Sequence, residues 1–424
     1  MRALWIAITF AAACNAAQDP TELLAQIRRN VDEQLSRSAN YTCTETLERS
    51  YYRNNGFDMA LGGPGGVAIP KNQLLQDRLR LDIAVSEGKE IYAWHGAGRF
   101  SSPELSDIVR HGPVSTGQFV GYLKNIFITP GIEFAFRGKT QNVNGGVYRF
   151  DFAVPLKASG SHVRTRNGDP PVPFHGWFSV RASDLQLIKL DITDDQIPAD
   201  SNIQAVHTVL QYQMARMFGR ETIIPSLFIL EIQDDEHVYS VSRGAYSNCH
   251  EFSSESRLRF DSVSDSSAAS PGTGPVSEQP VLPAGLSLQI GLTTEIDDET
   301  AYAGDRVEGI LLKALRIPGS SEIIPKKTIV QGIITRFAAY SQPEKQYDLR
   351  IEFRHLLAKN KVYRLRALHV PSSAEMYGAY GSLMPEYVIN NLHDGSLLVH
   401  SKHLRLKKGF SGVWKTKKAP EGPG

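Results

Sequence analysis

The cysteines of this chain are the residues whose chemistry depends most on which partners they meet. Cys43 lies in the run ANYTCTETLERSYYR, and Cys249 lies much later in the chain. Thiols in an oxidising compartment tend to pair, so these two side chains are candidates for a disulfide. In the chain-entropy description, a bridge that closes so long a loop stabilises the fold by on the order of 5 kcal/mol at most. The alternative is two separate buried thiols.

Motifs that support catalysis or cofactor binding are not found in the sequence. A GxSxG elbow would expose a nucleophilic serine, but GFSGV from Gly409 has a different spacing. A phosphate-binding P-loop and a dinucleotide fingerprint are also missing. The twelve histidines are scattered, and we interpret QDDEH, residues 233–237, as a hairpin turn and not as a metal site. We therefore expect a protein that is not an enzyme and that holds no cofactor and no metal.

Aromatic side chains form the one constellation that suggests a binding surface. The apolar residues of IEFAF, 132–136, share one face of a strand, and those of YRFDFAV, 148–154, alternate in the same way. The Asn144-Gly145 turn between the two runs sets them opposite each other. This apolar wall is either a hydrophobic core beneath helices or the lining of a ligand cavity. The candidates for the lining are Phe119, Leu123, Phe127, Phe134, Phe136, Tyr148, Phe150 and Phe152.

An antiparallel sheet is predicted to position these residues. From Tyr41 to Phe260, apolar and polar residues alternate along runs that are interrupted by turn residues. Ahead of the sheet, residues 19–35 predict an amphipathic helix with Asp19 as its N-cap. Two shorter helices are predicted at 102–112 and 115–127, and each of these helices needs a sheet surface to cover.

The N-terminus is interpreted as an export signal. Met1-Arg2 precedes the apolar run Ala3 to Ala13, which is too short for a bilayer, since spanning takes about 20 apolar residues. The run FAAAC is similar to a lipobox, so lipidation of Cys14 is one prediction. The other is cleavage after Ala16 or Ala17, which would discard this cysteine. Either way we expect an exported protein, in the periplasm or associated with the outer membrane.

A change in composition divides the rest of the chain. Residues 262–281 are rich in Ser, Gly and Pro and nearly lack large apolar side chains. We interpret them as a linker that lets two domains move independently. The predicted organisation is a signal peptide at 1–17, a sheet domain at 18–261, the linker at 262–281, a small β-barrel or sandwich domain at 282–400 and a basic tail at 401–424. Within the second domain, residues 372–400 are too irregular to assign.

The formal net charge is only +1, which creates no global field toward nucleic acid, so electrostatic contacts must come from local clusters. One such cluster lies near the C-terminus, where cations interleave with Phe410 and Trp414 and no acid occurs from 402 to 418. This segment has the composition to contact anionic lipid head groups or other acidic polymers. The alternative is a solvated flexible tail. The cations are Lys402, Arg405, Lys407, Lys408, Lys415, Lys417 and Lys418.

The run GWFSVRASDLQLIKLDI, Gly176 to Ile192, gives the first domain its family likeness. Together with the signal, the helix and the meander, it makes this domain resemble the LolA/LolB/RseB group of periplasmic proteins. The resemblance implies a strongly curved antiparallel sheet that forms an open half-barrel with helices at its mouth. It also implies that the apolar concavity receives acyl chains of lipoproteins or related ligands.

The second domain resembles the β-rich domain of TrbI-type conjugation and secretion proteins, through LPAGLSLQI, the AGD at Ala303 to Asp305 and the run Ile323 to Ile334. Where that family has the glycine of an IPKG turn, this chain has Lys327. The resemblance implies a small β-barrel in an envelope protein, without a role in secretion. The expected fold class is mainly β, with α+β character in the N-terminal domain: a curved antiparallel sheet with a few covering helices, followed by a small β-barrel or sandwich.

The function that these observations predict is binding by hydrophobic burial. We expect a non-enzymatic cell-envelope protein that holds an acyl chain, a lipoprotein or an apolar peptide in the curved-sheet domain. Its partners would be that ligand, other envelope proteins and a membrane surface contacted by the basic tail, and not nucleic acid. The alternative is a structural or scaffolding protein that binds other proteins and has no ligand cavity.

Overall fold

The structure is a computed structural model. It describes residues 19–36, 40–53, 73–86, 88–97, 100, 105–109, 112–142, 145–217, 219–235, 238–251, 279–341, 345–359, 361–370 and 395–418. The predicted signal peptide, Cys14, Asn144 and most of the predicted linker lie outside these ranges. Within the described ranges, no helix is both long enough and apolar enough to cross a membrane.

Helix α1, Pro20–Ser36, opens the described chain. The amide of Thr21 donates a hydrogen bond of 2.9 Å to Oδ1 of Asp19, which confirms the predicted N-cap. Leu23, Ile27 and Val31 are fully buried at helical spacing, so one face of the helix packs on the sheet.

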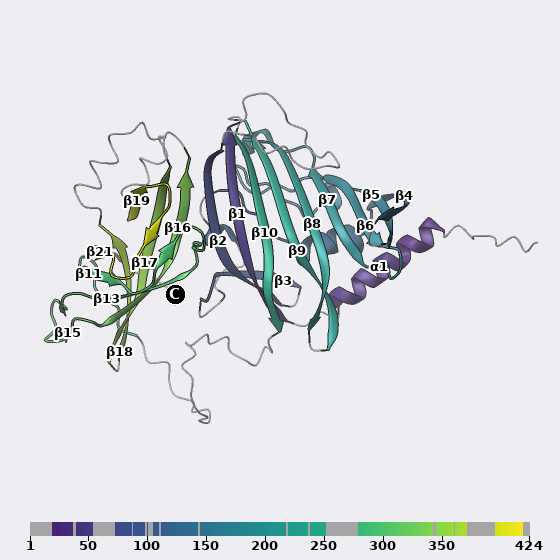
Figure 1. The fold of residues 1–424 in the computed structure, drawn as a ribbon. Coiled ribbons are helices and arrows are strands. Elements are labelled where there is room, and N and C mark those ends of the chain that lie inside the picture. Colours follow the sequence, from purple (N-terminus) through teal and green to yellow (C-terminus); the bar gives the residue numbers. More distant parts are fainter. Residues whose placement is uncertain are drawn as a thin grey trace, which may run out of the picture.

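Ten antiparallel strands form the sheet of the N-terminal half, in the spatial order β3-β2-β1-β10-β9-β8-β7-β6-β5-β4. Their bounds are β1 Tyr41–Arg53, β2 Gln73–Ser86, β3 Lys89–Trp94, β4 Glu133–Asn142, β5 Gly145–Val154, β6 Phe174–Arg181, β7 Leu187–Asp194, β8 Ile203–Met217, β9 Arg220–Asp234 and β10 Val238–Glu251. After β3 the chain crosses to the far edge and returns strand by strand, so the first and last strands pair. Figure 1 shows the resulting curved wall.

Short helical segments lie along the crossing between β3 and β4. They are α2 Leu105–Ile108, α3 Gly121–Leu123 and the π-helical turn η1 Lys124–Ile128; η2 Leu156–Ala158 and η3 Ala199–Ser201 follow later. Arg28 of α1 donates a hydrogen bond of 2.7 Å from Nε to the carbonyl of Phe127, which joins α1 to η1. Together α1, α3 and η1 cover the apolar inner side of the sheet, as expected from its alternation.

A closed antiparallel barrel makes up the C-terminal half, which confirms the expected fold class. Its strands pair in the order β11-β13-β16-β17-β18-β21, and β21 pairs again with β11. The strands of this half are β11 Ser287–Leu292, β12 Ile296–Asp297, β13 Arg306–Leu311, β14 Leu315–Arg316, β15 Ile323–Ile324, β16 Ile329–Tyr340, β17 Gln346–Ala358, β18 Lys361–His369, β19 Ser396–His400, β20 Arg405–Leu406 and β21 Ser411–Thr416.

The C-terminal basic segment is part of this barrel and not a flexible tail. Strand β21 closes the barrel, and Trp414 is fully buried with its ring 5.3 Å from that of Phe353. Val413 and Lys415, on either side of Trp414, point outward. The prediction of a tail was wrong because the lysines of this closing strand lie on its solvent side. They dominate the local composition and obscure the alternation of apolar and polar residues that is typical of a strand.

The barrel is joined to the sheet by direct strand pairing. Residues 338–340 of β16 pair with residues 75–77 at the free edge of β2 (Figure 1). Beyond this pairing, the amide of Arg80 donates a hydrogen bond of 2.6 Å to the carbonyl of Ala303, and the amide of Ala303 donates one of 2.9 Å to the carbonyl of Arg78. The expected independent movement of the two halves does not fit this seam, in which one β-sheet continues into the other.

Candidate functional site

The aromatic wall predicted from the sequence forms a packed core. Phe178 lies at its centre, with ring centroids 4.9 Å from Phe127, 5.3 Å from Phe150 and 6.2 Å from Phe134. Phe127, Phe150 and Phe178 are fully buried, and the contacts are edge-to-face or stacked, as in protein interiors. Of the two alternatives, a hydrophobic core beneath helices or the lining of a ligand cavity, the aromatic wall is the hydrophobic core.

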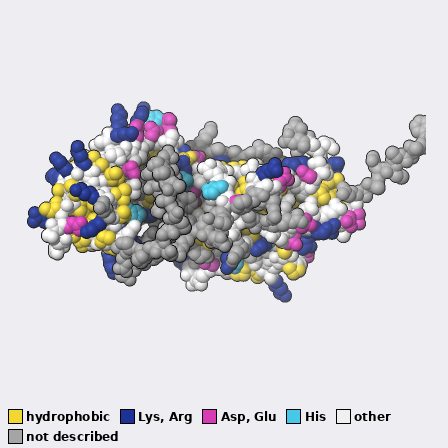
Figure 2. All heavy atoms as spheres, turned by 90° about the horizontal axis from the view of Figure 1, so that it is seen from below, with side chains coloured by type: hydrophobic (Ala, Val, Ile, Leu, Met, Phe, Trp, Pro, Cys, Tyr) yellow, Lys and Arg dark blue, Asp and Glu magenta, His cyan; other side chains and the backbone are white. Residues whose placement is uncertain are grey.

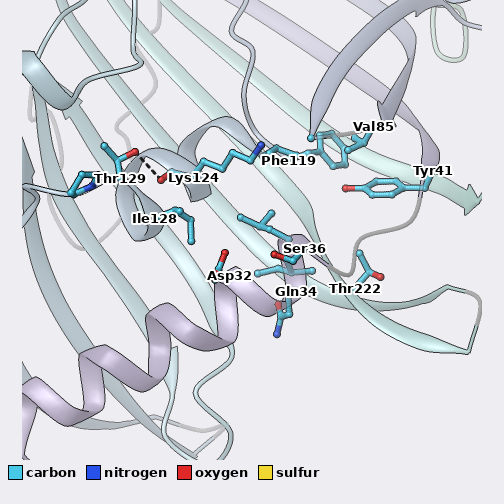
Figure 3. Close-up of a pocket in the computed structure, with 15 residues that line it drawn as sticks. Asp32, Gln34, Ser36, Tyr41, Val85, Phe119, Lys124, Ile128, Thr129 and Thr222 are labelled. Carbon is cyan, nitrogen blue, oxygen red and sulfur yellow. Dashed lines mark hydrogen bonds between the residues drawn. The ribbon is translucent and has the colours of Figure 1, made fainter.

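A separate cavity of about 560 Å³ lies at one rim of the sheet. It is bounded by the end of α1, the start of β1, the β2–β3 turn, the start of β9 and the segment from Phe119 to Pro130 (Figure 3). We call this cavity the rim pocket. Its lining is Asp32, Gln34, Leu35, Ser36, Tyr41, Val85, Gly88, Phe119, Val120, Lys124, Ile128, Thr129, Pro130, Thr222 and Ile223.

The loop that leads into α3 supplies Phe119 and Val120, and the half-buried Glu90 and the buried Tyr212 hold it by hydrogen bonds. Oε1 of Glu90 accepts hydrogen bonds of 3.1 Å from the amides of both residues, and Oε2 accepts one of 3.0 Å from the amide of Gly117. The hydroxyl of Tyr212 donates a hydrogen bond of 2.9 Å to the carbonyl of Gln118. Because each of these backbone groups has a side-chain partner, the loop is held in place as a wall of the pocket.

Tyr41 supplies a buried hydroxyl to the rim pocket. Its side chain is 2% exposed, its ring lies 5.9 Å from that of Phe119, and its hydroxyl points into the space between Phe119 and α1 (Figure 3). Burial raises the pKa of Tyr41, so the hydroxyl stays neutral. On the other wall, the buried Oε1 of Gln34 has no hydrogen-bond partner within the described part of the chain. A neutral hydroxyl such as that of Tyr41 can donate a hydrogen bond to a polar group of a ligand.

Two exposed charges stand at the mouth of the pocket. Lys124 projects from η1 across the opening, and its Nζ lies so close to Gly88 that a Cβ on that glycine would be 2.5 Å away. Asp32 lies on the α1 side of the opening (Figure 3). The mouth therefore offers one cation and one anion, whereas Val85, Phe119 and Ile223 make the interior apolar.

An acid lies in the core close to the pocket. Glu45 on β1 is buried, and its side chain reaches toward Gly244 of β10, where a Cβ would come within 2.8 Å of its Oε1. Burial raises the pKa of Glu45 to about 7, and the negative charge of Glu90 adds to the rise. Tyr246, its neighbour across the strands, packs edge-on against Phe119 with ring centroids 5.0 Å apart. This acid has no access to the rim pocket, so it supports the wall without touching a ligand.

The residues predicted from the sequence fall into three groups. Cys43 and Cys249 form a disulfide between β1 and β10, as predicted. Phe119 lines the rim pocket, but the other seven proposed lining residues do not, and they pack in or against the core. They are Leu123, Phe127, Phe134, Phe136, Tyr148, Phe150 and Phe152.

The predicted cation cluster is exposed throughout, but it is not uniform. Nε of Arg405 forms an ion pair of 2.5 Å with Oε1 of Glu295, so its charge is already balanced within the barrel. Lys415 points outward from β21, and Lys407 and Lys408 lie in the turn that precedes this strand. Their contact with an anionic surface stays a prediction. In the described ranges, no cluster of three or more His, Cys, Asp or Glu side chains is placed to hold a metal ion.

Sequence reasoning missed Tyr41, Lys124 and Glu90. Tyr41 was placed at the start of the predicted sheet, and Lys124 lies within the predicted helix 115–127 without having been singled out. No local pattern marks Glu90, because its partners, the amides 117–120, come from a loop far along the chain. The described lining of the pocket combines apolar side chains with polar ones, among them Tyr41, Lys124 and Asp32.

Comparisons with known proteins find only distant likenesses. No protein-family model matches the chain, and no curated protein matches it either. Among solved structures, the chain is similar to a LolA superfamily protein from Nitrosomonas europaea, with a TM-score of 0.28 and 11% identity over 54% of this chain and 94% of that one. It is also similar to a DUF1329 family protein from Desulfovibrio piger, with a TM-score of 0.26 and 12% identity over 57% of this chain and 98% of that one.

Proposed function

We propose that this chain is a non-enzymatic cell-envelope protein that binds an acyl chain, or a ligand that carries one, in the rim pocket. The observation that carries the proposal is the pocket itself, which is preformed, has apolar side chains in its walls and receives a neutral hydroxyl from Tyr41. Its volume of about 560 Å³ lies within the range of roughly 300 to 1,000 Å³ of small-molecule sites.

The arrangement of groups suits an amphiphile. The tail would lie against Val85, Phe119 and Ile223, where burying apolar surface contributes about 25 cal/mol per Å². The polar end would lie toward Tyr41 and Lys124, since a hydroxyl and an ammonium are both donors for the oxygens of an ester, a carboxylate or a phosphate. A purely apolar peptide would leave both donors without a partner, so an acyl ligand fits better.

Export to the envelope is part of the proposal. The N-terminal run from Ala3 to Ala13 has the length and composition of a secretory signal. The disulfide between Cys43 and Cys249 supports the same compartment, because such bonds persist in oxidising surroundings and are rare in reducing ones.

Fluorescence binding of dansylated lauric acid to the delipidated full chain tests the proposal. Ile128→Ser removes an exposed apolar wall residue, and we expect the dissociation constant to rise about tenfold. Tyr41→Phe keeps the ring and removes the hydroxyl, with an expected rise of up to about tenfold. Leu156→Ser is the matched control, because Leu156 is also an exposed apolar residue but lies outside the pocket. If the delipidated protein does not bind the probe, the scaffolding alternative replaces this proposal.

A further inference from the structure

The outer wall of the barrel carries exposed apolar side chains on β21, on β16 and directly after β13. Leu312 is 39% exposed, Val413 41% and Ile329 42%. Val413 pairs with Gln289 on β11, and the amide of Leu312 donates a hydrogen bond of 2.8 Å to the carbonyl of the same Gln289 from the other side. Ile329 pairs with Ile310 on β13, so the three exposed residues share one continuous face.

The packing explains why these side chains stay on the outside. Leu288 and Ile290 point into the barrel, so Gln289 between them points out. Leu312 leans over the bare backbone of Gly291, where a Cβ would lie 3.1 Å from its Cδ2. The apolar residues are therefore presented at the surface by strand alternation, and the core is already filled from the inside.

Four lysines border these residues. Lys313 follows Leu312, Lys415 lies two positions from Val413 on the same side of β21, and Lys326 and Lys327 precede Ile329. All four are exposed, and none forms an ion pair with an acid in the described chain. We call the three apolar residues and these four lysines the basic-apolar face; Figure 2 shows hydrophobic side chains among Lys and Arg over the barrel.

Three acids of the barrel have partners other than these four lysines. Glu295 pairs with Arg405, and Glu322 pairs with Lys361. Glu308, on the outside of β13, accepts a hydrogen bond of 2.7 Å from Nε2 of Gln331. Gln331 is neutral, so Glu308 keeps its negative charge, but the four lysines outnumber this acid and leave the face with a net positive charge, which is the complement of an anionic surface.

We propose that the basic-apolar face docks on the head-group region of an anionic phospholipid membrane. Lysines attract the protein to anionic lipid, and the apolar side chains at their centre enter the boundary between head groups and acyl chains. A single-stranded nucleic acid is a poorer fit, because such partners stack on exposed aromatic rings and the face has none. The face lies on the barrel, so this docking is independent of ligand binding in the rim pocket.

Vesicle flotation with the full chain tests the docking. We expect binding to vesicles of phosphatidylcholine with phosphatidylglycerol, weak binding to phosphatidylcholine alone, and release at high salt. The double variant Leu312→Ser/Lys313→Glu should weaken binding about tenfold or more, since both the charge and the apolar contact are lost. The matched control is Leu156→Ser/Lys157→Glu, an adjacent exposed pair outside the barrel, which should bind like the wild type.

Two more variants of exposed residues test the contributions of the apolar side chains and of the lysines to binding separately. Val413→Ser should weaken binding, and Lys326→Glu/Lys415→Glu should weaken it and reduce its salt dependence. Equal binding to neutral and anionic vesicles, or wild-type binding by Leu312→Ser/Lys313→Glu, would overturn the proposal. If only the lysine variants lose vesicle binding and Val413→Ser binds like the wild type, the proposal is also overturned. The face would then be a contact for soluble polyanions.

Discussion

The carboxylate of Glu90 accepts a hydrogen bond of 3.1 Å from the backbone amide of Phe119. The same carboxylate also binds the amides of Gly117 and Val120 and the hydroxyl of Tyr92, so one acid on β3 fixes the loop that forms a wall of the rim pocket. The shape of the pocket thus depends on a side chain that does not line it.

Glu90→Gln should lower both stability and ligand affinity. An amide has only one acceptor oxygen, so at least one backbone N–H of the loop loses its partner. We expect the free energy of unfolding in urea to fall by about 2–4 kcal/mol. The control is Glu133→Gln at the exposed start of β4, where the change should stay within about 0.5 kcal/mol. Equal unfolding of the wild type and Glu90→Gln would contradict the role given to this acid.

The disulfide between Cys43 and Cys249 ties the first strand of the sheet to the last. It closes a loop of 206 residues, so its loss enlarges the conformational freedom of the unfolded chain. We expect the free energy of unfolding of the double variant Cys43→Ala/Cys249→Ala to be about 2–5 kcal/mol lower than that of the oxidised protein. Reduced wild-type protein should behave like the variant. A urea midpoint that does not respond to reductant would show that the bridge is absent or without effect.

His207 should make stability depend on pH. Its Nε2 lies 2.9 Å from Asp191 and its Nδ1 lies 2.9 Å from Glu231, and these hydrogen bonds raise the pKa of His207 to about 9. Because the folded state binds this proton more tightly than the unfolded chain, the stabilisation is complete below about pH 6.5 and is lost as the pH rises toward 9.

Urea denaturation across this pH window measures the effect. The wild type should lose up to about 3 kcal/mol between pH 6.5 and pH 9, and His207→Gln should lose much less over the same interval. His162→Gln, on an exposed loop, is the control and should follow the wild type. If the free energy of unfolding depends on pH in the same way for His207→Gln and the wild type, His207 is not the source of the effect.

The seam between sheet and barrel depends on the close approach of Gly304 to β2. Its φ is +106°, and a Cβ would lie 2.1 Å from the carbonyl oxygen of Arg80. Around it, the ring of Tyr302 lies between the guanidinium groups of Arg78 and Arg80, each 4.3 Å from the ring centroid. The seam therefore has no room for a side chain at position 304.

Gly304→Ala should open the seam. We expect hydrogen exchange at the amides of Arg80 and Ala303 to accelerate at least tenfold, while amides inside the barrel exchange as before. The matched control is Gly285→Ala, which has a similar φ of +94° but open space at the Cβ. If both variants accelerate exchange at the seam equally, backbone strain and not the close approach is the cause.

Alternation and turn residues were enough to predict an antiparallel sheet followed by a small β-barrel or sandwich. The pairing of Cys43 with Cys249 followed from composition and compartment. The closing strand of the barrel was missed because its partner β11 lies far back in the chain and its lysines dominate the local composition. The seam was missed because nothing local shows that the AGD turn packs against Arg80.

The site was harder to predict than the fold. Phe127 and Phe150 have the side chains expected of a cavity lining, but rings that meet across strands fill the space between them. Tyr41 becomes a pocket residue only because α1 ends beside it, and Lys124 only because η1 turns toward Gly88. Such placements depend on contacts between distant segments, which alternation along one strand does not encode.

Photo-crosslinking with a diazirine-labelled fatty acid, followed by peptide mass spectrometry, tests the acyl-binding site most directly. The full chain should be labelled at residues 32–36, at Tyr41 and at residues 119–130 and 222–223, and excess unlabelled fatty acid should compete. Ile128→Ser should reduce this labelling. Labels confined to the barrel, or labels that no competitor removes, would contradict the assignment of the rim pocket as the binding site.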